Sequence, residues 1–341
     1  MRAYGRRKVL ALAAGVLAAA TACTGNAPAE PSKAAATSSV SASPSPSAPS
    51  TAVTRAEAAD EFFKFTATDD ALRAPSELQG RLDLELKDVV TGGQAPLTAA
   101  AFLSHDFAPP RYRWGTPKLF VPRFAPEERA PWFSALATRD GSPTLLTFTK
   151  SDRWRLSSAA ELLPGQEVPE IQLDAEGYAT ALAPDDKTVT ISPQFMGPVH
   201  ASVAETGSAG VTAGLLAAGP YTTDVAEQIA SLREKAKNDG FSYDSIFSAD
   251  NYPVYALRAK DGGALIQYSL SRTTSTTTKT AEDDYIPVPE QARWAITTPV
   301  LRRSLKLVET HQYATVVPPL KAPAAAPVIA HDGALTRASG Q

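Results

Sequence analysis

Cysteine is almost absent from this sequence, because its 341 residues include a single Cys, at position 23. One cysteine cannot form a disulfide within the chain or a thiolate metal site, so packed cores must stabilise the folded part. The four histidines lack metal-ligand spacing such as HExxH, and neither a GxSxG motif nor a phosphate loop is present. We therefore expect no metal, no cofactor and no catalytic residue, that is, a protein that is not an enzyme.

An excess of charge of one sign is also lacking. The 33 Lys and Arg residues nearly balance the 36 Asp and Glu residues, and no basic block alternates with aromatic residues. Removal of residues 1–22 would take away four basic residues and no acidic one, leaving a mildly acidic chain. This distribution argues against a nucleic-acid partner.

Long apolar runs are missing as well. The run from Val9 to Ala20 has 12 residues, whereas a membrane-spanning helix needs about 20. It follows Arg6, Arg7 and Lys8 and precedes small residues, an order typical of a cleavable export signal. We therefore expect residues 1–22 to be a signal peptide.

The end of this signal, Ala20-Thr21-Ala22-Cys23, resembles the bacterial lipobox. That resemblance implies cleavage between Ala22 and Cys23 and a diacylglycerol on the Cys23 sulfur, which would anchor the protein to the outer face of the cytoplasmic membrane. The alternative is an ordinary secretory signal cut near Ala22. Arg6-Arg7 also resembles a twin-arginine export signal; the alternative is a basic region read by the general secretory route.

The segment that follows the signal, residues 23–52, is dominated by Ala, Pro, Ser and Thr. It has no large apolar side chains to bury, so we expect a disordered linker. Such a linker would hold the folded part away from the bilayer.

The folded part shows a weak internal repeat. Ala135–Gly141 precedes Leu145–Phe148, and Ala256–Gly262 precedes Leu265–Tyr268. Both patterns predict two strands joined at an Asp-Gly turn. The repeat favours two related domains, residues 53–168 and 169–341, although two unrelated hairpins would produce the same pattern.

Each half also contains a helix signal. Thr54 and Glu57 form a capping box before Ala58, Phe62 and Phe65, and Thr223–Asn238 carries one apolar face that ends at Gly. Strands are predicted at Leu82–Val90, Arg111–Val121, Trp132–Arg139, Thr144–Lys150, Trp154–Ser157, Thr188–Ser192, Val199–Glu205, Val254–Lys260, Ala264–Thr274, Arg293–Thr298, Ser304–Val317 and Pro327–Thr336.

These elements predict an α+β fold, in which one helix packs on a curved antiparallel sheet in each domain. The hairpin Trp132–Arg139 and Leu145–Lys150, followed by Arg153–Leu156, resembles the last strands of nuclear-transport-factor-2-like (NTF2-like, or cystatin-like) domains. The whole chain is similar to uncharacterised actinobacterial lipoproteins with two such domains. The resemblance implies a helix leaning across a cone-shaped sheet, and it implies no particular functional residue.

Several polar and aromatic residues are candidates for a site. We interpret each histidine (His105, His200, His311, His331) as a surface or hydrogen-bonded residue, and the carboxylate pairs (Asp69-Asp70, Glu127-Glu128, Asp185-Asp186, Asp283-Asp284) as solvated. The aromatic cluster favours core or inter-domain packing; the alternative is an aromatic-lined ligand mouth. That cluster consists of Tyr112, Trp114, Phe120, Phe124, Trp132 and Phe133. Arg111 and Arg113 flank Tyr112 and favour a solvated strand face; the alternative is that they face an anionic ligand.

The resulting expectation is a non-catalytic, lipid-anchored envelope protein that binds a protein, glycan or lipid partner. One alternative is a small-ligand carrier or an enzyme that uses the cavity of one domain. A cavity that holds a buried carboxylate or histidine would favour this alternative, and filled domains would count against it. A second alternative is a structural stalk.

Overall fold

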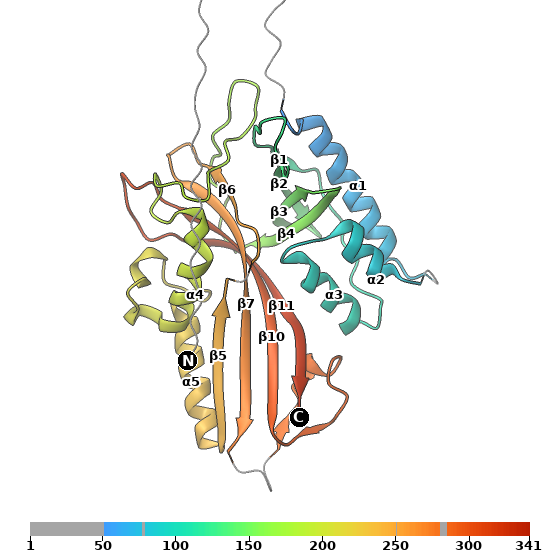
Figure 1. Ribbon diagram of the computed structural model, residues 1–341, viewed down its shortest axis with the longest axis vertical. Helices are drawn as coiled ribbons and strands as arrows, with labels where there is room; N and C mark the ends of the chain where they lie inside the picture. Colours follow the sequence, from blue (N-terminus) through green and yellow to red (C-terminus); the bar gives the residue numbers. More distant parts are fainter. Residues whose placement is uncertain (1–50, 77–78, 250, 280–284) are drawn as a thin grey trace, which may run out of the picture. The chain divides into compact units, whose positions relative to one another are not determined.

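The computed structural model describes residues 51–76, 79–249, 251–279 and 285–341. The predicted signal peptide, Cys23 and the predicted linker up to residue 50 lie outside this part of the chain, as does the pair Asp283-Asp284. From Pro49 onward the chain forms one compact unit. Its architecture is α+β, with helices packed against a large antiparallel sheet, as the sequence predicts (Figure 1).

Within the described residues, nine strands form the main sheet in the order β1-β2-β3-β4-β11-β10-β7-β5, and β6 pairs with β7. The strands are β1 (Lys118–Phe120), β2 (Trp132–Arg139), β3 (Ser142–Lys150), β4 (Trp154–Leu162), β5 (Phe241–Ser248), β6 (Tyr255–Arg258), β7 (Ala264–Thr278), β10 (Ser304–Val317) and β11 (Val328–Gly340). A separate pair consists of β8 (Ile286–Pro287) and β9 (Val300–Leu301).

Five α-helices accompany the sheet in the described part of the chain. Figure 1 shows α1 to α3 beside β1–β4, and α4 and α5 beside β5 and β7. Their bounds are α1 (Arg55–Arg73), α2 (Arg81–Leu84), α3 (Gln94–Ser104), α4 (Met196–Thr206) and α5 (Thr223–Asn238).

The predicted start of α1 is confirmed. The Thr54 hydroxyl accepts a hydrogen bond from the Glu57 backbone N–H at 3.1 Å, and Ala58, Phe62 and Phe65 are buried. The Glu57 carboxylate does not complete the capping box, because it accepts hydrogen bonds from Lys150 and Trp154 instead. The helix is thereby tied at its first turn to the sheet.

Both predicted Asp-Gly hairpins are present. β2 and β3 pair from Trp132↔Thr149 to Arg139↔Ser142, and β6 pairs with the start of β7. Gly141 (φ 93°) and Gly262 (φ 91°) adopt positive φ values that L side chains disfavour, which explains glycine at both turns.

The two halves of the sequence share one sheet. β4 pairs with β11 through Ala330↔Leu162 and His331↔Glu161, so strands from residues 53–168 and 169–341 form a continuous surface. We call this junction the seam. The two-domain NTF2-like architecture is not confirmed, because the sheet does not separate at the predicted boundary.

Two predicted strands are helical. Leu82–Val90 alternates Leu with charged residues, yet it forms α2 and a π-helical turn at Glu85–Val89. Val199–Glu205 belongs to α4, whose buried residues include Met196, His200, Val203 and Ala204 at helical spacing. In both segments tertiary packing prevails over a short strand-like pattern.

Three further strand predictions are wrong over most of their length. Arg111–Val121 contains only the short β1 and an isolated bridge at Trp114, and Thr188–Ser192 contributes one bridge at Val189. Arg293–Thr298 follows a 3₁₀ turn and forms no strand. Frequent prolines in and around these segments remove backbone N–H donors that a sheet requires.

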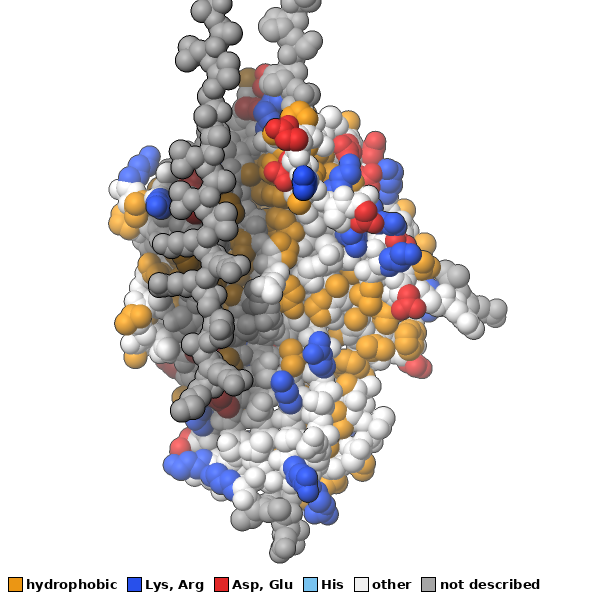
Figure 2. Space-filling view, in the orientation of Figure 1, with side chains coloured by type: hydrophobic (Ala, Val, Ile, Leu, Met, Phe, Trp, Pro, Cys, Tyr) orange, Lys and Arg blue, Asp and Glu red, His pale blue; other side chains and the backbone are white. Residues whose placement is uncertain are grey.

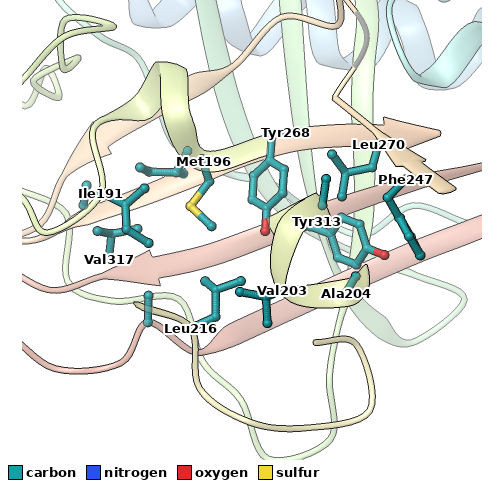
Figure 3. Close-up of a cluster of buried hydrophobic side chains, with 14 of the residues drawn as sticks. Ile191, Met196, Val203, Ala204, Leu216, Phe247, Tyr268, Leu270, Tyr313 and Val317 are labelled. Atoms are coloured by element: carbon teal, nitrogen blue, oxygen red, sulfur yellow. The ribbon is translucent and has the colours of Figure 1, made fainter. Parts of the chain in front are cut away.

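Each half has its own hydrophobic core. In the first half, Phe62, Phe65, Phe133 and Phe148 pack together between α1 and the sheet. The core of the second half fills the space between α4, α5 and the sheet with Tyr268, Tyr313 and aliphatic side chains (Figure 3).

Candidate functional site

A cavity of about 120 Å³ lies between α1, α3 and the sheet, at the seam between the halves. We call it the inner chamber. α1 contributes Asp69 and Arg73, whereas Arg139 ends β2 and Asp332 lies on β11. The remaining lining residues are Phe65, Val90, Gln94, Leu97, Thr98, Ala101, Tyr112, Trp114, Leu156, Ala159 and Ala334.

A buried ion pair forms one wall of the inner chamber. Asp69 and Arg73 lie one helical turn apart on α1, and the Arg73 Nε atom donates to Asp69 Oδ1 at 2.6 Å. Their side chains are only 4% and 3% exposed. Burial raises the pKa of the Asp69 carboxyl more strongly than the charge of Arg73 lowers it. The pair therefore carries compensating charges in a place from which water is largely excluded.

Glu85 lies behind this wall on the π-helical turn. It is fully buried (0% exposed), and neither carboxyl oxygen has a hydrogen-bond partner among the described residues. Burial raises the pKa of Glu85 to about 8, and the negative charge of Asp69 raises it further in the same direction. Glu85 is therefore predominantly protonated and neutral at pH 7. Such π-helical turns are frequent at functional sites.

A second ion pair crosses the seam. Arg139 Nη2 donates to Asp332 Oδ2 at 3.0 Å, joining the end of β2 to β11. The ring of Tyr112 lies between two guanidinium groups, with its centroid 4.9 Å from Arg73 Cζ and 5.1 Å from Arg139 Cζ. These cation–π contacts hold both arginines against one aromatic side chain at the chamber.

One residue that lines the chamber also has an unused hydrogen-bonding group. The Trp114 indole N–H is buried and has no acceptor among the described residues. Beside the inner chamber, across Phe65 and Leu156, lies a hollow of about 260 Å³ lined by α1, the π-helical turn and β4. The first half therefore contains two neighbouring hollows, and charged groups lie in the wall of the inner one.

The core of the second half is filled by side chains. His200 Nδ1 lies 2.7 Å from the Tyr268 hydroxyl, which lies 2.9 Å from Thr315 Oγ1, and His200 Nε2 lies 2.6 Å from the Tyr221 carbonyl. His200, Tyr268 and Tyr313 contact one another through their rings. Figure 3 shows Tyr268 and Tyr313 surrounded by aliphatic side chains. Burial lowers the pKa of His200 to about 4, so its imidazole is neutral at pH 7.

The interpretation of the histidines as hydrogen-bonded residues is confirmed. His105 is exposed and its Nδ1 lies 2.9 Å from the Ala101 carbonyl, while His311 Nδ1 lies 3.0 Å from His331 Nε2 across β10 and β11. The sequence did not indicate that three of the four histidines share one aromatic cluster. Among the residues that the structure describes, no group of three or more His, Cys, Asp or Glu side chains is arranged to hold a metal ion.

The interpretation of the carboxylate pairs as solvated needs a correction at Asp69 and Asp186. Asp70 is exposed and pairs with Arg111, as expected for a solvated face. Asp69 is buried because it continues the apolar stripe of α1, and Asp186 is largely buried because it pairs with Arg258 at 2.7 Å.

The aromatic cluster divides between its two interpretations. Phe120, Trp132 and Phe133 are buried in the cores, as predicted for packing. Tyr112 and Trp114 line the inner chamber, as the alternative of a ligand mouth requires.

Apart from Tyr112 and Trp114, sequence reasoning did not identify the residues of the inner chamber as parts of a site. Asp69 follows Ala58, Phe62 and Phe65 at positions that share their helix face, and this spacing is a signal that was present. Glu85 and the Arg139–Asp332 pair had no such signal, because the first lies in an unpredicted π-helical turn and the second joins residues 193 positions apart.

In the described ranges of the chain, no helix is both long and apolar enough to span a bilayer. The chain resembles two curated proteins. One, an uncharacterized lipoprotein of Streptomyces coelicolor, is 32% identical over 177 residues, which are 48% of this chain and 49% of the relative. The other, an uncharacterized lipoprotein of Streptomyces avermitilis, is 28% identical over 191 residues, which are 52% of this chain and 54% of the relative.

The chain therefore spans about half the length of the curated relatives that it matches. No solved structure matches it. A family model, Domain of unknown function (DUF8094), matches residues 49–340, which are the whole compact unit except for its last residue. The chain belongs to this family.

Proposed function

We propose that this protein is a lipid-anchored, non-catalytic binding protein on the extracytoplasmic side of the membrane, and that it holds a small polar ligand in the inner chamber. The anchor is a diacylglycerol on Cys23, after removal of residues 1–22. The names of the Streptomyces relatives support the lipoprotein part of this proposal. We further propose that each half derives from an NTF2-like unit, now fused through the seam.

The observation that carries the ligand-binding part is the contrast between the halves. The chamber at the seam has a buried ion pair in its wall, with the buried, unpartnered carboxyl group of Glu85 behind that wall, whereas the core of the second half is packed with rings. An unpaired buried polar group destabilises a protein, so its presence beside a cavity favours a functional site. Because the chamber's charges compensate one another, and Glu85 is protonated at pH 7, the site is suited to holding a ligand rather than to abstracting a proton.

The ligand-binding part is tested on the full-length protein purified from membranes in detergent, by native mass spectrometry for a bound small molecule. Ala101→Phe places a large side chain into the chamber from α3. Leu103→Phe is the matched control, because Leu103 is exposed on the same helix and does not line the chamber. We expect the bound species to be lost in the first variant and retained in the second. Equal retention in both, or no bound species in the unmodified protein, would contradict the proposal.

The anchor is tested separately, by metabolic labelling with a fatty acid. We expect label in the unmodified protein and none in Cys23→Ser. Label that persists in the variant would exclude Cys23 as the attachment site. A protein or glycan partner of the envelope remains compatible with the chamber, which would then hold one small group of that partner.

A further inference from the structure

We infer that the inner chamber takes a small zwitterionic α-amino acid; this inference rests on the proposed ligand-binding function and names its ligand class. The argument begins with charge. Two opposite pairs, Asp69–Arg73 and Asp332–Arg139, face the chamber, so their charges cancel. A ligand with a net charge would leave one charge uncompensated in a partly buried place, whereas a zwitterion leaves none.

The groups that remain unused match a carboxylate at one side of the chamber. Arg139 Nη2 donates to Asp332 and also lies 3.7 Å from Glu161 Oε2, whereas Arg139 Nε and Nη1 have no hydrogen-bond acceptor among the described residues. The Trp114 indole N–H is likewise without an acceptor. A guanidinium fork and an additional N–H donor are the arrangement that carboxylate oxygens accept best.

An ammonium group finds an acceptor at Asp69, which also lines the chamber. Arg73 donates a hydrogen bond to Asp69 Oδ1, so the second carboxylate oxygen, Asp69 Oδ2, remains able to accept one. The neighbouring aromatic rings of Phe65 and Tyr112 also line the chamber and favour a cation at their faces. The ligand's two charged groups therefore meet partners of opposite sign that the protein has already placed.

The size of the chamber limits the side chain of the amino acid. Its volume of about 120 Å³ corresponds to roughly four water molecules in the liquid, at about 30 Å³ each. The walls next to the charged groups are aliphatic, formed by Val90, Leu97 and Leu156. Such space suits glycine or alanine and excludes an aromatic or long side chain. Figure 2 shows acidic and basic side chains interspersed over the region of α1, so the surrounding surface also lacks a strong charge of one sign.

Titration calorimetry on the full-length protein in detergent tests the inference, with alanine, glycine, acetate, methylammonium and phenylalanine as probes. We expect alanine or glycine to bind at least about tenfold more tightly than acetate or methylammonium, because each of these carries only one of the two charges. Phenylalanine should bind no more tightly than acetate. Acetate that binds as tightly as alanine would overturn the inference, since the amino group would then be irrelevant.

Variants locate the site. Arg139→Gln and Trp114→Phe should each weaken alanine binding, Arg139→Gln by about tenfold or more. Arg233→Gln, at an exposed ion pair on α5, should leave it unchanged. In the unmodified protein, alanine should also shift the NMR signal of the Trp114 indole N–H, which a purely structural effect of the variants would not produce. Unchanged affinity in both chamber variants would place the binding elsewhere and overturn the inference.

One outcome separates this inference from the proposed function. If native mass spectrometry recovers a bound molecule that Ala101→Phe abolishes, but no amino acid binds in calorimetry, the proposed function stands and the ligand class is wrong. If no molecule is recovered and no probe binds, both fail.

Discussion

Both halves of the sheet carry helices, but the space between helices and sheet is used differently in each (Figure 1). The first half leaves a chamber beside a buried ion pair and an unpartnered carboxyl group, whereas the second half fills its interior with tyrosine, histidine and aliphatic side chains. In the second half, His200, Tyr268 and Thr315 form a buried hydrogen-bonded chain. If the proposed function is right, this difference separates a ligand site at the seam from a core in the second half that serves stability alone.

The halves should also respond to pH in opposite directions. Burial raises the pKa of Glu85 in the first half to about 8. This group therefore lowers the free energy of unfolding as the pH rises, because the unfolded chain releases a proton that the folded chain retains. In the second half, burial lowers the pKa of His200 to about 4 and of His331 to about 3. These groups lower stability as the pH falls below the usual range of histidine, because the unfolded chain then binds protons that the folded chain does not.

Removing one partner of the buried ion pair should have the largest effect. Arg73→Met leaves Asp69 buried without a counter-charge, and we expect the free energy of unfolding to fall by about 3–5 kcal/mol. The double variant Asp69→Leu/Arg73→Met should recover most of this loss, since no buried charge remains. Urea denaturation followed by circular dichroism measures both values. A loss below about 1 kcal/mol in the single variant would show that water reaches the pair, as at an exposed ion pair.

The pH dependence of stability that Glu85 contributes should disappear in Glu85→Gln. Glu85 has its usual pKa of 4.5 in the unfolded chain and a pKa of about 8 in the folded protein. Between these two pH values, Glu85 is ionised in the unfolded chain and protonated in the folded protein. The stability of the unmodified protein relative to this variant should therefore fall by about 1.4 kcal/mol per pH unit as the pH rises. Urea denaturation at several pH values measures the slope, with Glu127→Gln in an exposed loop as the control. Parallel curves for Glu85→Gln and the unmodified protein would contradict a neutral buried Glu85.

Removing one hydroxyl from the filled half should have an intermediate effect. Tyr268→Phe leaves His200 Nδ1 and Thr315 Oγ1 without this partner in a buried place. We expect a loss of about 1–3 kcal/mol in the free energy of unfolding and no change in ligand binding. Tyr243→Phe on β5 is the matched control, because the Tyr243 hydroxyl does not belong to the hydrogen-bonded chain of His200, Tyr268 and Thr315. If Tyr268→Phe changed ligand affinity, the separation of roles between the halves would be wrong.

Substitutions in the two hairpin turns should reduce stability least, and by similar amounts in the two halves. Gly141→Ala and Gly262→Ala place a side chain at φ values of 93° and 91°. A Cβ atom would meet no atom within 4 Å at Gly141 and only ordinary contacts at Gly262. Each substitution should therefore cost about 1–2 kcal/mol through backbone strain alone, measured by thermal unfolding. A much larger loss in one hairpin would reveal a tertiary role that its partner lacks.

Elements with strong local signals were predictable from the sequence. Ser304–Val317 forms β10 with the predicted bounds, Thr223–Asn238 forms α5, and Thr54 caps α1. The two Asp-Gly hairpins were predictable because the turn itself requires glycine. In each case the decisive interactions are close together in the sequence.

The other elements and the chamber could not be predicted, because they depend on contacts between residues far apart in the sequence. Leu84 is 39% exposed while its neighbour Glu85 is fully buried, so the alternation that predicted a strand there was misleading. α3 and α4 are short helices whose packing partners lie elsewhere in the chain. The pairing of β4 with β11, which closes the sheet and builds the chamber, has no local signal at all.

The position of β11 has a consequence for how the protein is made. Of the strands in the main sheet β11 comes last in the sequence, yet it lies in the middle, between β4 and β10. A chain that ends before Val328 would present two unpaired strand edges and half of the seam's ion pair. The sheet therefore becomes continuous, and the chamber gains Asp332, only after β11 has been synthesised. We expect proteases to recognise a prematurely ended product by its two open strand edges.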